Sequence, residues 1–422
     1  MSRQPGPVAV TAAAVLTPLA EDLDGFTAAL LAGRSAVTLG GEQGDALPLA
    51  ALAAFDLASW AGRHLADAPE AAARLRKVAG RAALPARSAA CVALRAVRDA
   101  RLEEEQLADS TVLIVAGSNL ALAHQAQTVL GHDRAPGRLR ASYALTHLDV
   151  DVVGAVSELT GIRAEGWALG GASASGTLAL IQAARTVAAG WAERALVVAP
   201  VAELSPVEAE ALRRTGAMAH EHFRDEPAHM CRPFDTARQG FVRGEGAAAF
   251  VLEHPDAAHR RGAPVLAEIT GHGQRLDARR GTEPDAAGQE AAMRTALTAA
   301  GIGPGDIDYV NAHGTGSRLG DATEAASLQA VFGIRPSLRI NSTKPLTGHC
   351  LSAAGLIEAV ATVAQLRAGT VHPNVNLHQP DTALPLAGRT AEQRPLRCAL
   401  SNSFAFGGIN ASVVIRLPDP RP

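Results

Sequence analysis

Short apolar segments rich in β-branched residues alternate along the chain with longer segments whose apolar residues recur at helical spacing. Residues 111–117, 194–199 and 247–253 are of the first kind, and such runs predict strands buried on both faces. Between the first two runs, a helical pattern begins at Thr177 and ends at Gly190. Strand, helix and strand in this order predict right-handed crossovers and a mainly parallel sheet.

A second series of the same kind follows. The pattern predicts strands at residues 265–270, 307–311, 338–341 and 413–417, and helices at residues 288–300, 321–332 and 353–368. Nearer the start it predicts a strand at residues 7–11 and helices at residues 22–32 and 88–99. Residues 201–233 have mixed charge and predict a surface excursion with short helices.

The order of elements is similar in the two series, although no sequence repeat is evident. We therefore predict a duplicated α/β architecture, with one half spanning residues 1–260 and the other spanning residues 261–422. At 422 residues the chain can bury a large core.

Composition and charge exclude several classes of protein. The chain is 47% apolar with 40 glycines, which is typical of a packed globular protein. The net charge of −3 gives no electrostatic reason to expect nucleic acid or an anionic membrane as a partner. No early segment combines a basic start, an apolar run and a cleavage site, so no secretory signal is predicted. No run reaches the ~18 apolar residues that span a bilayer. The four cysteines lie far apart without CxxC spacing, so neither a metal site nor a disulfide framework is predicted. A cytoplasmic protein is expected.

A glycine-rich turn before the helix at Thr177 is the first candidate for chemistry. It reads Leu-Gly-Gly-Ala-Ser-Ala-Ser-Gly and contains Ser173 and Ser175. The first amides of a helix lack internal partners and carry the positive end of its dipole. A hydroxyl there could act as a nucleophile, with the free amides stabilising an oxyanion. Taken alone, the turn favours a serine that only caps the helix, and the motifs that follow in the chain reverse this preference.

Four further turns follow predicted strands, where ligands of open α/β sheets bind. Two of them carry histidines, in Asn-Ala-His313-Gly-Thr-Gly and in Asn-Ser-Thr-Lys344-Pro-Leu-Thr-Gly-His349. The other two are glycine-punctuated, at residues 240–246 and in Ser-Asn-Ser-Phe404-Ala-Phe406-Gly-Gly. Each alone could be structural, but four such turns in one chain predict a shared site.

These motifs, in this order, resemble those of the β-ketoacyl synthases of fatty-acid and polyketide synthesis. The resemblance also rests on Arg-Pro-Phe-Asp at residues 232–235 and Pro-Asn-Val-Asn-Leu at residues 373–377, and it covers nearly the whole chain. It implies the thiolase fold, with two duplicated halves in an αβαβα arrangement. It also implies a homodimer that acts on acyl carrier protein through its phosphopantetheine arm, with no bound metal or redox cofactor.

Residue roles follow from the resemblance. His313 and His349 are expected to be the two active-site histidines, with Lys344 supporting them and Glu324 as the partner of that lysine. Thr315 and Thr347 are expected to line the channel for the phosphopantetheine arm. Phe406 matches a gatekeeping phenylalanine, with Phe404 beside it as a further substrate contact. Cys350 lies off the nucleophile turn and is expected in the core.

The family reads Ala-Cys-x-x-Gly at the turn that opens the central helix, and counting back from Gly190 places Ser173 at the cysteine position. A thiol ionises near pH 8.5 and more readily at a helix N-terminus, whereas a serine hydroxyl needs a general base. An oxyester is also a weaker electrophile than a thioester. Serine thus impairs condensation and leaves decarboxylation possible, because that step needs fixed hydrogen-bond donors to the enolate oxygen.

The sequence therefore predicts an enzyme that decarboxylates malonyl-acyl carrier protein to acetyl-acyl carrier protein without chain elongation. It resembles the serine-bearing decarboxylases of polyketide β-branching cassettes. Two alternatives stay open. Ser173 could carry an acyl group in condensation or acyl transfer, or the chain could be a silent partner subunit like the chain-length factors. Retention of both histidines and Lys344 argues against the silent subunit.

Overall fold

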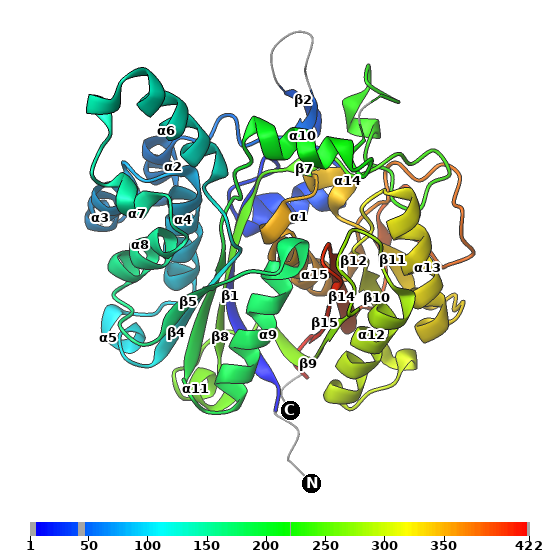
Figure 1. Ribbon diagram of the computed structural model, residues 1–422. Coiled ribbons are helices and arrows are strands. Elements are labelled where there is room, and N and C mark those ends of the chain that lie inside the picture. The colour runs from blue at the N-terminus through cyan, green and yellow to red at the C-terminus, as the bar shows by residue number, and fades with distance from the viewer. Residues whose placement is uncertain (1–5, 41–46, 220, 420–422) are drawn as a thin grey trace.

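A mixed sheet forms the centre of the computed structural model, which describes residues 6–40, 47–219 and 221–419 (Figure 1). In these residues the sheet has ten strands. Their order is β11 (Arg339–Asn341), β10 (Tyr309–Asn311), β14 (Cys398–Ala405), β15 (Ile409–Arg416), β9 (Ala267–Leu276), β1 (Val8–Leu16), β8 (Ala247–Glu253), β6 (Arg194–Ala199), β4 (Thr111–Ala116) and β5 (Gly166–Leu169).

The strand order repeats about the central pair, β1 and β9. Counted outward from that pair, each set of five reads first, fifth, fourth, second and third in chain order. The directions repeat as well: in each set, the fifth strand is antiparallel to both of its neighbours within the set, and the outer pairings are parallel. β1 and β9 pair antiparallel to each other. The halves proposed from the sequence, before and after residue 260, would divide the chain between β8 and β9.

The expectation of a mainly parallel sheet is wrong. Five of the nine pairings that build the ten-stranded sheet are antiparallel and four are parallel. One reason is a tight hairpin between β14 and β15, since only antiparallel strands can be joined by so short a turn. Gly407 and Gly408 adopt φ values of 86° and 72° in that turn, a conformation that glycine adopts without steric penalty.

Two buried helices, α9 (Ser175–Ala188) and α15 (Ala354–Ala368), lie between the two sets of strands (Figure 1). Both contact strands of each set and one another. They cross closely because Gly176 and Gly355 lack side chains. A Cβ on Gly176 would lie 2.5 Å from the Leu356 amide nitrogen, and a Cβ on Gly355 would lie 2.3 Å from Thr177 Oγ1. This crossing fixes where the two helices begin.

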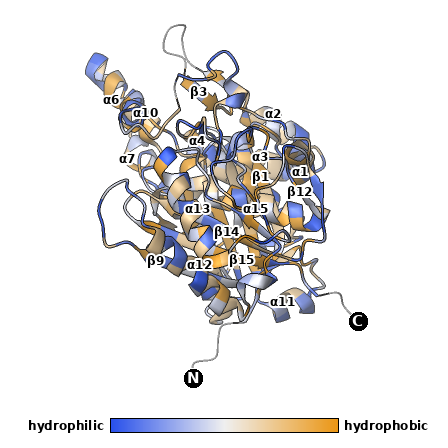
Figure 2. Cartoon of the chain, turned by 90° about the vertical axis from the view of Figure 1, so that its right-hand side faces the viewer, coloured by the Kyte–Doolittle hydropathy of each residue, from blue (hydrophilic) through white to orange (hydrophobic). Residues whose placement is uncertain are grey.

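Further helices cover the outer faces of the strands and complete a layered arrangement (Figure 1). On the first set lie α2 (Leu57–His64), α3 (Pro69–Ala79), α4 (Leu84–Asp99) and α8 (Val150–Thr160), and on the second set lie α12 (Ala286–Ala300) and α13 (Arg318–Phe332). Apolar residues concentrate in the central strands, and hydrophilic residues lie on the outer helices and loops (Figure 2).

Most of the predicted elements occur within a few residues of the expected bounds. The sequence analysis named no element in residues 118–169, where the structure has α6 (Leu122–Arg134), α7 (Tyr143–Thr146), α8 and β5. It also missed β14, whose polar residues Ser401, Asn402 and Ser403 are all buried. The excursion after β6 contains α10 (Pro206–Arg214), which begins at a capping box between Ser205 and Glu208. α1 (Leu23–Leu31) is capped by Asp22, whose side chain accepts a hydrogen bond from the Gly25 amide.

Residues Leu351–Ala368, which include α15, have the length and hydropathy of a membrane span within the described part of the chain. However, 83% of that stretch is buried inside the protein, which is the setting of a core helix.

Candidate active site

The turn that opens α9 presents Ser173 to a cavity. Residues Ala172–Ala174 form one turn of 3-10 helix, and Ala172 has a φ of 47°. Ser175 closes this turn: its hydroxyl accepts from the Gly171 amide at 2.8 Å and donates to the Ala172 carbonyl at 2.7 Å. The Ser173 side chain has no hydrogen-bond partner among the described residues and lines the cavity. Ser175, not Ser173, therefore has the structural role in this turn.

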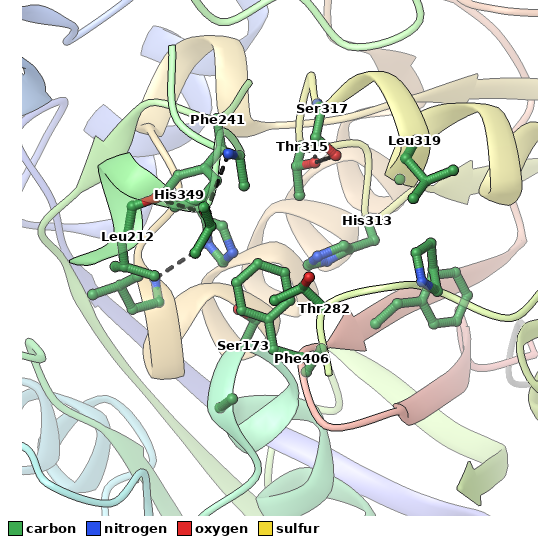
Figure 3. A pocket seen from close by; sticks show the side chains of 18 of the residues that line it. Ser173, Leu212, Phe241, Thr282, His313, Thr315, Ser317, Leu319, His349 and Phe406 are labelled. Atoms are coloured by element: carbon green, nitrogen blue, oxygen red, sulfur yellow. Dashed lines mark hydrogen bonds between the residues drawn. The ribbon is translucent and has the colours of Figure 1, made fainter. Parts of the chain in front are cut away.

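The cavity has a volume of about 780 Å³ and is lined by loops from both sets of strands. Ser173, Thr282, Phe406 and the His313 imidazole gather on one side of it, and His349 lies opposite beside Phe241 and Leu212 (Figure 3). His313 follows the carboxyl end of β10, and His349 follows β11. This is the edge of the sheet at which ligands bind in α/β folds, as the sequence predicted.

Carboxylates of α13 hold the His313 loop. Glu324 accepts hydrogen bonds from the His313 and Gly314 amides, at 2.8 and 2.7 Å. Asp321 accepts from the Thr315 and Gly316 amides, each at 3.0 Å. Four consecutive amides of the loop are thus held by two buried side chains, and the His313 ring keeps a fixed position.

The two imidazoles face each other across the cavity. Their ring centroids are 5.5 Å apart and their planes are nearly perpendicular, at 85° (Figure 3). His349 is further held by its own backbone, since its amide donates to the Val242 carbonyl at 2.6 Å and its carbonyl accepts from the Gly244 amide at 2.9 Å. The glycine-punctuated loop at residues 240–246 therefore supports His349.

Both rings meet a hydrogen-bond donor at Nδ1. The Leu351 amide donates to His349 Nδ1 at 3.2 Å, and Lys344 Nζ lies 3.5 Å from His313 Nδ1. A neutral imidazole whose Nδ1 accepts carries its proton on Nε2. Burial holds the pKa of both histidines well below the usual value, and the nearby Lys344 charge lowers it further. Both rings are therefore neutral donors at neutral pH.

Lys344 is fully buried and pairs with Glu358, not with Glu324 as the sequence analysis expected. Its Nζ lies 2.5 Å from Glu358 Oε1 and also donates to the His313 carbonyl. Glu324 lines the cavity, but its oxygens are occupied by main-chain amides. Glu358 was missed, although a lone carboxylate in an otherwise apolar helical run signals a buried charge pair.

The remaining predicted residues divide into two groups. Thr315, Phe404 and Phe406 line the cavity, and the Phe404 ring meets His313 edge-on at a centroid distance of 6.1 Å. Thr347 does not line it, contrary to expectation: its side chain is buried and its hydroxyl donates to the Gly348 carbonyl at 2.9 Å. The short helix α14 (Lys344–Thr347) directs the Thr347 side chain into the protein interior. The same helix places Lys344 Nζ next to the His313 ring.

A segment that the sequence analysis did not single out also borders the cavity. Residues 277–284 hold the turn between β14 and β15, because the Gly407 amide donates to the Gly281 carbonyl at 2.8 Å and the Asp277 amide donates to the Gly408 carbonyl at 2.9 Å. Thr282 of this segment lies among the cavity residues (Figure 3). Nothing in its polar, glycine-containing pattern separates it from an ordinary loop.

No cysteine lines the cavity in the described part of the chain, and all four cysteines are buried. Burial raises the pKa of Cys231 and of Cys398 to about 12. Cys350, next to His349, packs in the main core cluster as expected, and burial raises its thiol pKa as well. The site therefore offers a serine hydroxyl and no thiolate.

The fold and the site together define a class: a duplicated α/β protein that brings a helix-turn serine, a pair of neutral imidazoles and a buried lysine to one cavity. Comparisons with known proteins agree. Residues 6–258 match the N-terminal domain of β-ketoacyl synthase, and residues 266–378 match its C-terminal domain. The chain belongs to the β-ketoacyl synthase family.

Similar proteins include synthases and a decarboxylase. The chain is 33% identical over 415 residues to the polyketide biosynthesis malonyl-ACP decarboxylase PksF of Bacillus subtilis, covering 97% of this chain and 96% of that one. It is 30% identical over 418 residues to 3-oxoacyl-[acyl-carrier-protein] synthase 2 of Synechocystis, with 97% of each chain covered. A β-ketoacyl synthase structure from Burkholderia phymatum superposes with a TM-score of 0.84 at 28% identity, over 98% of this chain and all of that one. The predicted thiolase fold is confirmed.

Proposed function

We propose that this protein decarboxylates malonyl-acyl carrier protein to acetyl-acyl carrier protein in polyketide biosynthesis. The single observation that supports this most directly is Ser173 on the nucleophile turn, facing two intact imidazole donors. The similarity to PksF points the same way. Identity alone does not choose between activities, because a synthase and a decarboxylase match this chain almost equally well. The choice between the two activities therefore rests on the chemistry of the site.

The donor pair suits the decarboxylation step. The thioester carbonyl oxygen of the malonyl group would lie between the two Nε2–H groups. As the bond from the α-carbon to the carboxylate breaks, its electron pair moves into the enolate and carbon dioxide leaves. Negative charge then develops on the oxygen that the imidazoles hold, and one such positioned donor contributes roughly 3–4 kcal/mol. A proton from solvent on the α-carbon completes the acetyl thioester.

Condensation lacks its nucleophile here. The acyl group would have to move onto a side chain before the enolate attacks it. The Ser173 hydroxyl has no hydrogen-bonded base among the described residues, and both imidazoles present Nε2–H to the cavity and cannot accept its proton in this tautomer. Acyl transfer through Ser173 is the second candidate, favoured by its place at the start of α9. A silent subunit is disfavoured by the intact histidines and Lys344.

The substrate would enter as a thioester on the phosphopantetheine arm of acyl carrier protein, and Thr315 would line its path. We also propose that the protein is a cytoplasmic homodimer. β5 is an edge strand of the sheet, and the adjoining segment exposes apolar side chains, namely Val129, Leu130, Leu139, Leu145, Leu148 and Val150. A surface of this kind is typical of a protein interface.

Intact-protein mass spectrometry on the carrier tests the proposal. Malonyl-carrier protein is incubated with the enzyme, with and without a second carrier bearing an acyl chain. We expect acetyl-carrier protein in both mixtures and no β-ketoacyl product. The His313→Ala variant should lose this conversion. An elongated product, or a malonyl group that stays intact beside an acylated enzyme, would instead support condensation or acyl transfer.

A further inference from the structure

A second serine stands at the start of α15 in the place that Ser173 has at the start of α9. Ala172 and Leu351 have similar φ values of 47° and 52°, and each is followed by a serine, Ser173 or Ser352. The hydrogen bonds of the two turns also correspond, since the Ala174 amide donates to Gly171 at 3.0 Å and the Ala353 amide donates to Cys350 at 3.1 Å. Both serines line the same cavity.

The Ser352 hydroxyl has no partner in the described part of the protein. Its residue is 6% exposed, and Oγ is buried without a hydrogen bond. It lies against Gly117, where a Cβ would come within 3.0 Å of Oγ. Nearby buried serines are all satisfied: Ser175 bonds within its turn, Ser342 donates to Gly314, and Ser403 bonds Thr177.

A buried hydroxyl without a partner is unfavourable, so such a group in a cavity wall points to a ligand. No hydrogen bond among the described residues fixes the direction of this hydroxyl, although its residue lines the cavity. The hydroxyl stands at the positive end of a 15-residue buried helix, which favours an anionic oxygen as its acceptor. The structure thus calls for an acceptor on the α15 side of the cavity.

The opposite wall is unsuited to an anion. Asp321 and Glu324 of α13 present carboxyl groups there, and their oxygens already accept main-chain amides. These two side chains therefore offer a carboxylate in the cavity no hydrogen-bond donor. Ser352 also follows Leu351, whose amide bonds His349 Nδ1, so the hydroxyl belongs to the same turn as one of the carbonyl-binding imidazoles. In a malonyl thioester the carboxylate carbon is only two bonds from the thioester carbonyl carbon.

We propose that Ser352 binds the malonyl carboxylate and makes the site selective for carboxylated acyl groups. This inference rests on the proposed function. The carboxylate is lost as neutral carbon dioxide, so its hydrogen bond is stronger in the bound substrate than in the transition state. Ser352 therefore lowers KM and does not raise kcat. It is a positioning and specificity residue.

Binding of two stable pantetheine analogues tests the assignment. One carries a malonyl group through an amide in place of the thioester, and the other carries an isovaleryl group, which has the same shape without the charge. The native enzyme should bind the malonyl amide more tightly than the isovaleryl amide. In Ser352→Ala the malonyl amide should weaken about tenfold, as expected for one hydrogen bond to a charged group, with the isovaleryl amide unchanged. Ser337→Ala, an exposed serine between α13 and β11, is the control.

Kinetics with malonyl-carrier protein supply the second readout. Ser352→Ala and the near-isosteric Ser352→Cys should raise KM several-fold and leave kcat equal or higher. A fall in kcat at constant KM, or a native enzyme that binds both amides equally, would overturn the assignment. Failure of the proposed function is seen separately, because an enzyme that leaves malonyl-carrier protein intact would still show whether Ser352 discriminates between the amides.

Discussion

Each imidazole of the site owes its donor role to one neighbour. The Leu351 amide and Lys344 Nζ face the two Nδ1 atoms, and burial keeps both rings neutral. A protonated ring would have the same Nε2–H but would introduce a buried charge next to Lys344. The lysine therefore both aligns His313 and disfavours its protonation.

The rate of decarboxylation should stay level from about pH 8 down through the ordinary histidine pKa of about 6.5. The reason is that the pKa of both folded-state histidines is depressed. Thermal stability should behave differently. Below that ordinary value the unfolded chain binds more protons than the folded one, so stability falls as the pH falls. Rate measurements across this range, paired with melting curves, check both. A rate that halves near pH 6.5 would contradict the lowered pKa of the two histidines.

Removing one member of the Lys344–Glu358 pair should destabilise the protein more than removing both. Lys344→Met leaves the Glu358 carboxylate buried and unpaired, which typically costs about 3–5 kcal/mol of unfolding free energy. The double variant Lys344→Met with Glu358→Gln should recover much of that stability while its decarboxylation stays low, because His313 loses its support. Chemical denaturation and carrier-protein assays measure the two effects. Full activity in the double variant would show that the lysine has no part in positioning His313.

At this scale the sequence motifs located Ser173, His313, His349, Lys344 and the cavity phenylalanines. They could not show which carboxylate pairs with Lys344, because Glu324 and Glu358 lie on different helices and only the crossing of the layers selects one. They also could not separate Thr315 from Thr347. Each threonine precedes a glycine and lies within two residues of one of the two histidines. The direction of one short helical turn, α14, decides that Thr315 and not Thr347 faces the cavity.

Among the elements, the crossing of α9 and α15 places the turns that carry Ser173 and Ser352 at the cavity. Gly176 and Gly355 allow the two helices to touch at their first turns, so both turns open at one cavity. The sequence predicted each helix from its apolar spacing. It did not predict that they cross, because that contact depends on the duplicated halves packing together.

Gly355→Ala should destabilise the protein by about 1–3 kcal/mol, since the new Cβ would lie 2.3 Å from Thr177 Oγ1. Activity should fall with it, because the turn that carries Ser352 and the ring of His349 would shift. Gly62→Ala is the matched control: Gly62 is also helical, and nothing lies within 4 Å of a Cβ there. That change should be neutral or stabilising by up to about 1 kcal/mol. Equal melting temperatures for both variants would contradict the close crossing.

The missed elements share a physical cause. β14 carries polar residues that are buried only because Ser412 and Glu324 satisfy Asn402 across strands and helices. The segment from α6 to α7 has weak amphipathic spacing and several exposed apolar residues. The buried polar residues of β14 are explained by contacts with other parts of the fold, which periodicity within one segment does not reveal.

On the scale of the whole molecule, the repeated strand order explains why one cavity receives residues from both ends of the chain. The segments that follow β5 in the first set and β10 and β11 in the second set all reach the cavity, where they place Ser173, His313 and His349. The segment of α6 and α7 extends beside them with its apolar side chains exposed. We expect the partner subunit there.

The proposed dimer should dissociate when charge enters this surface. Leu130→Asp and Leu148→Asp replace side chains that are 57% and 44% exposed in the single chain, and each would bury a carboxylate in the interface. Light scattering after gel filtration should give a dimer for the native protein and a monomer for the double variant. Ile334→Asp, 55% exposed on the far loop after α13, should leave the dimer intact. A monomeric native protein would rule the interface out.

We propose that the histidine pair carries out the decarboxylation without a side-chain nucleophile. The most direct test measures the conversion of malonyl- to acetyl-carrier protein by the Ser173→Ala variant, using the intact mass of the carrier. This variant should keep a rate within a few-fold of the native rate, while His313→Ala should lose the conversion. Loss of conversion in a folded Ser173→Ala variant, together with an acyl adduct on Ser173 in the native enzyme, would contradict the account and make the serine a nucleophile.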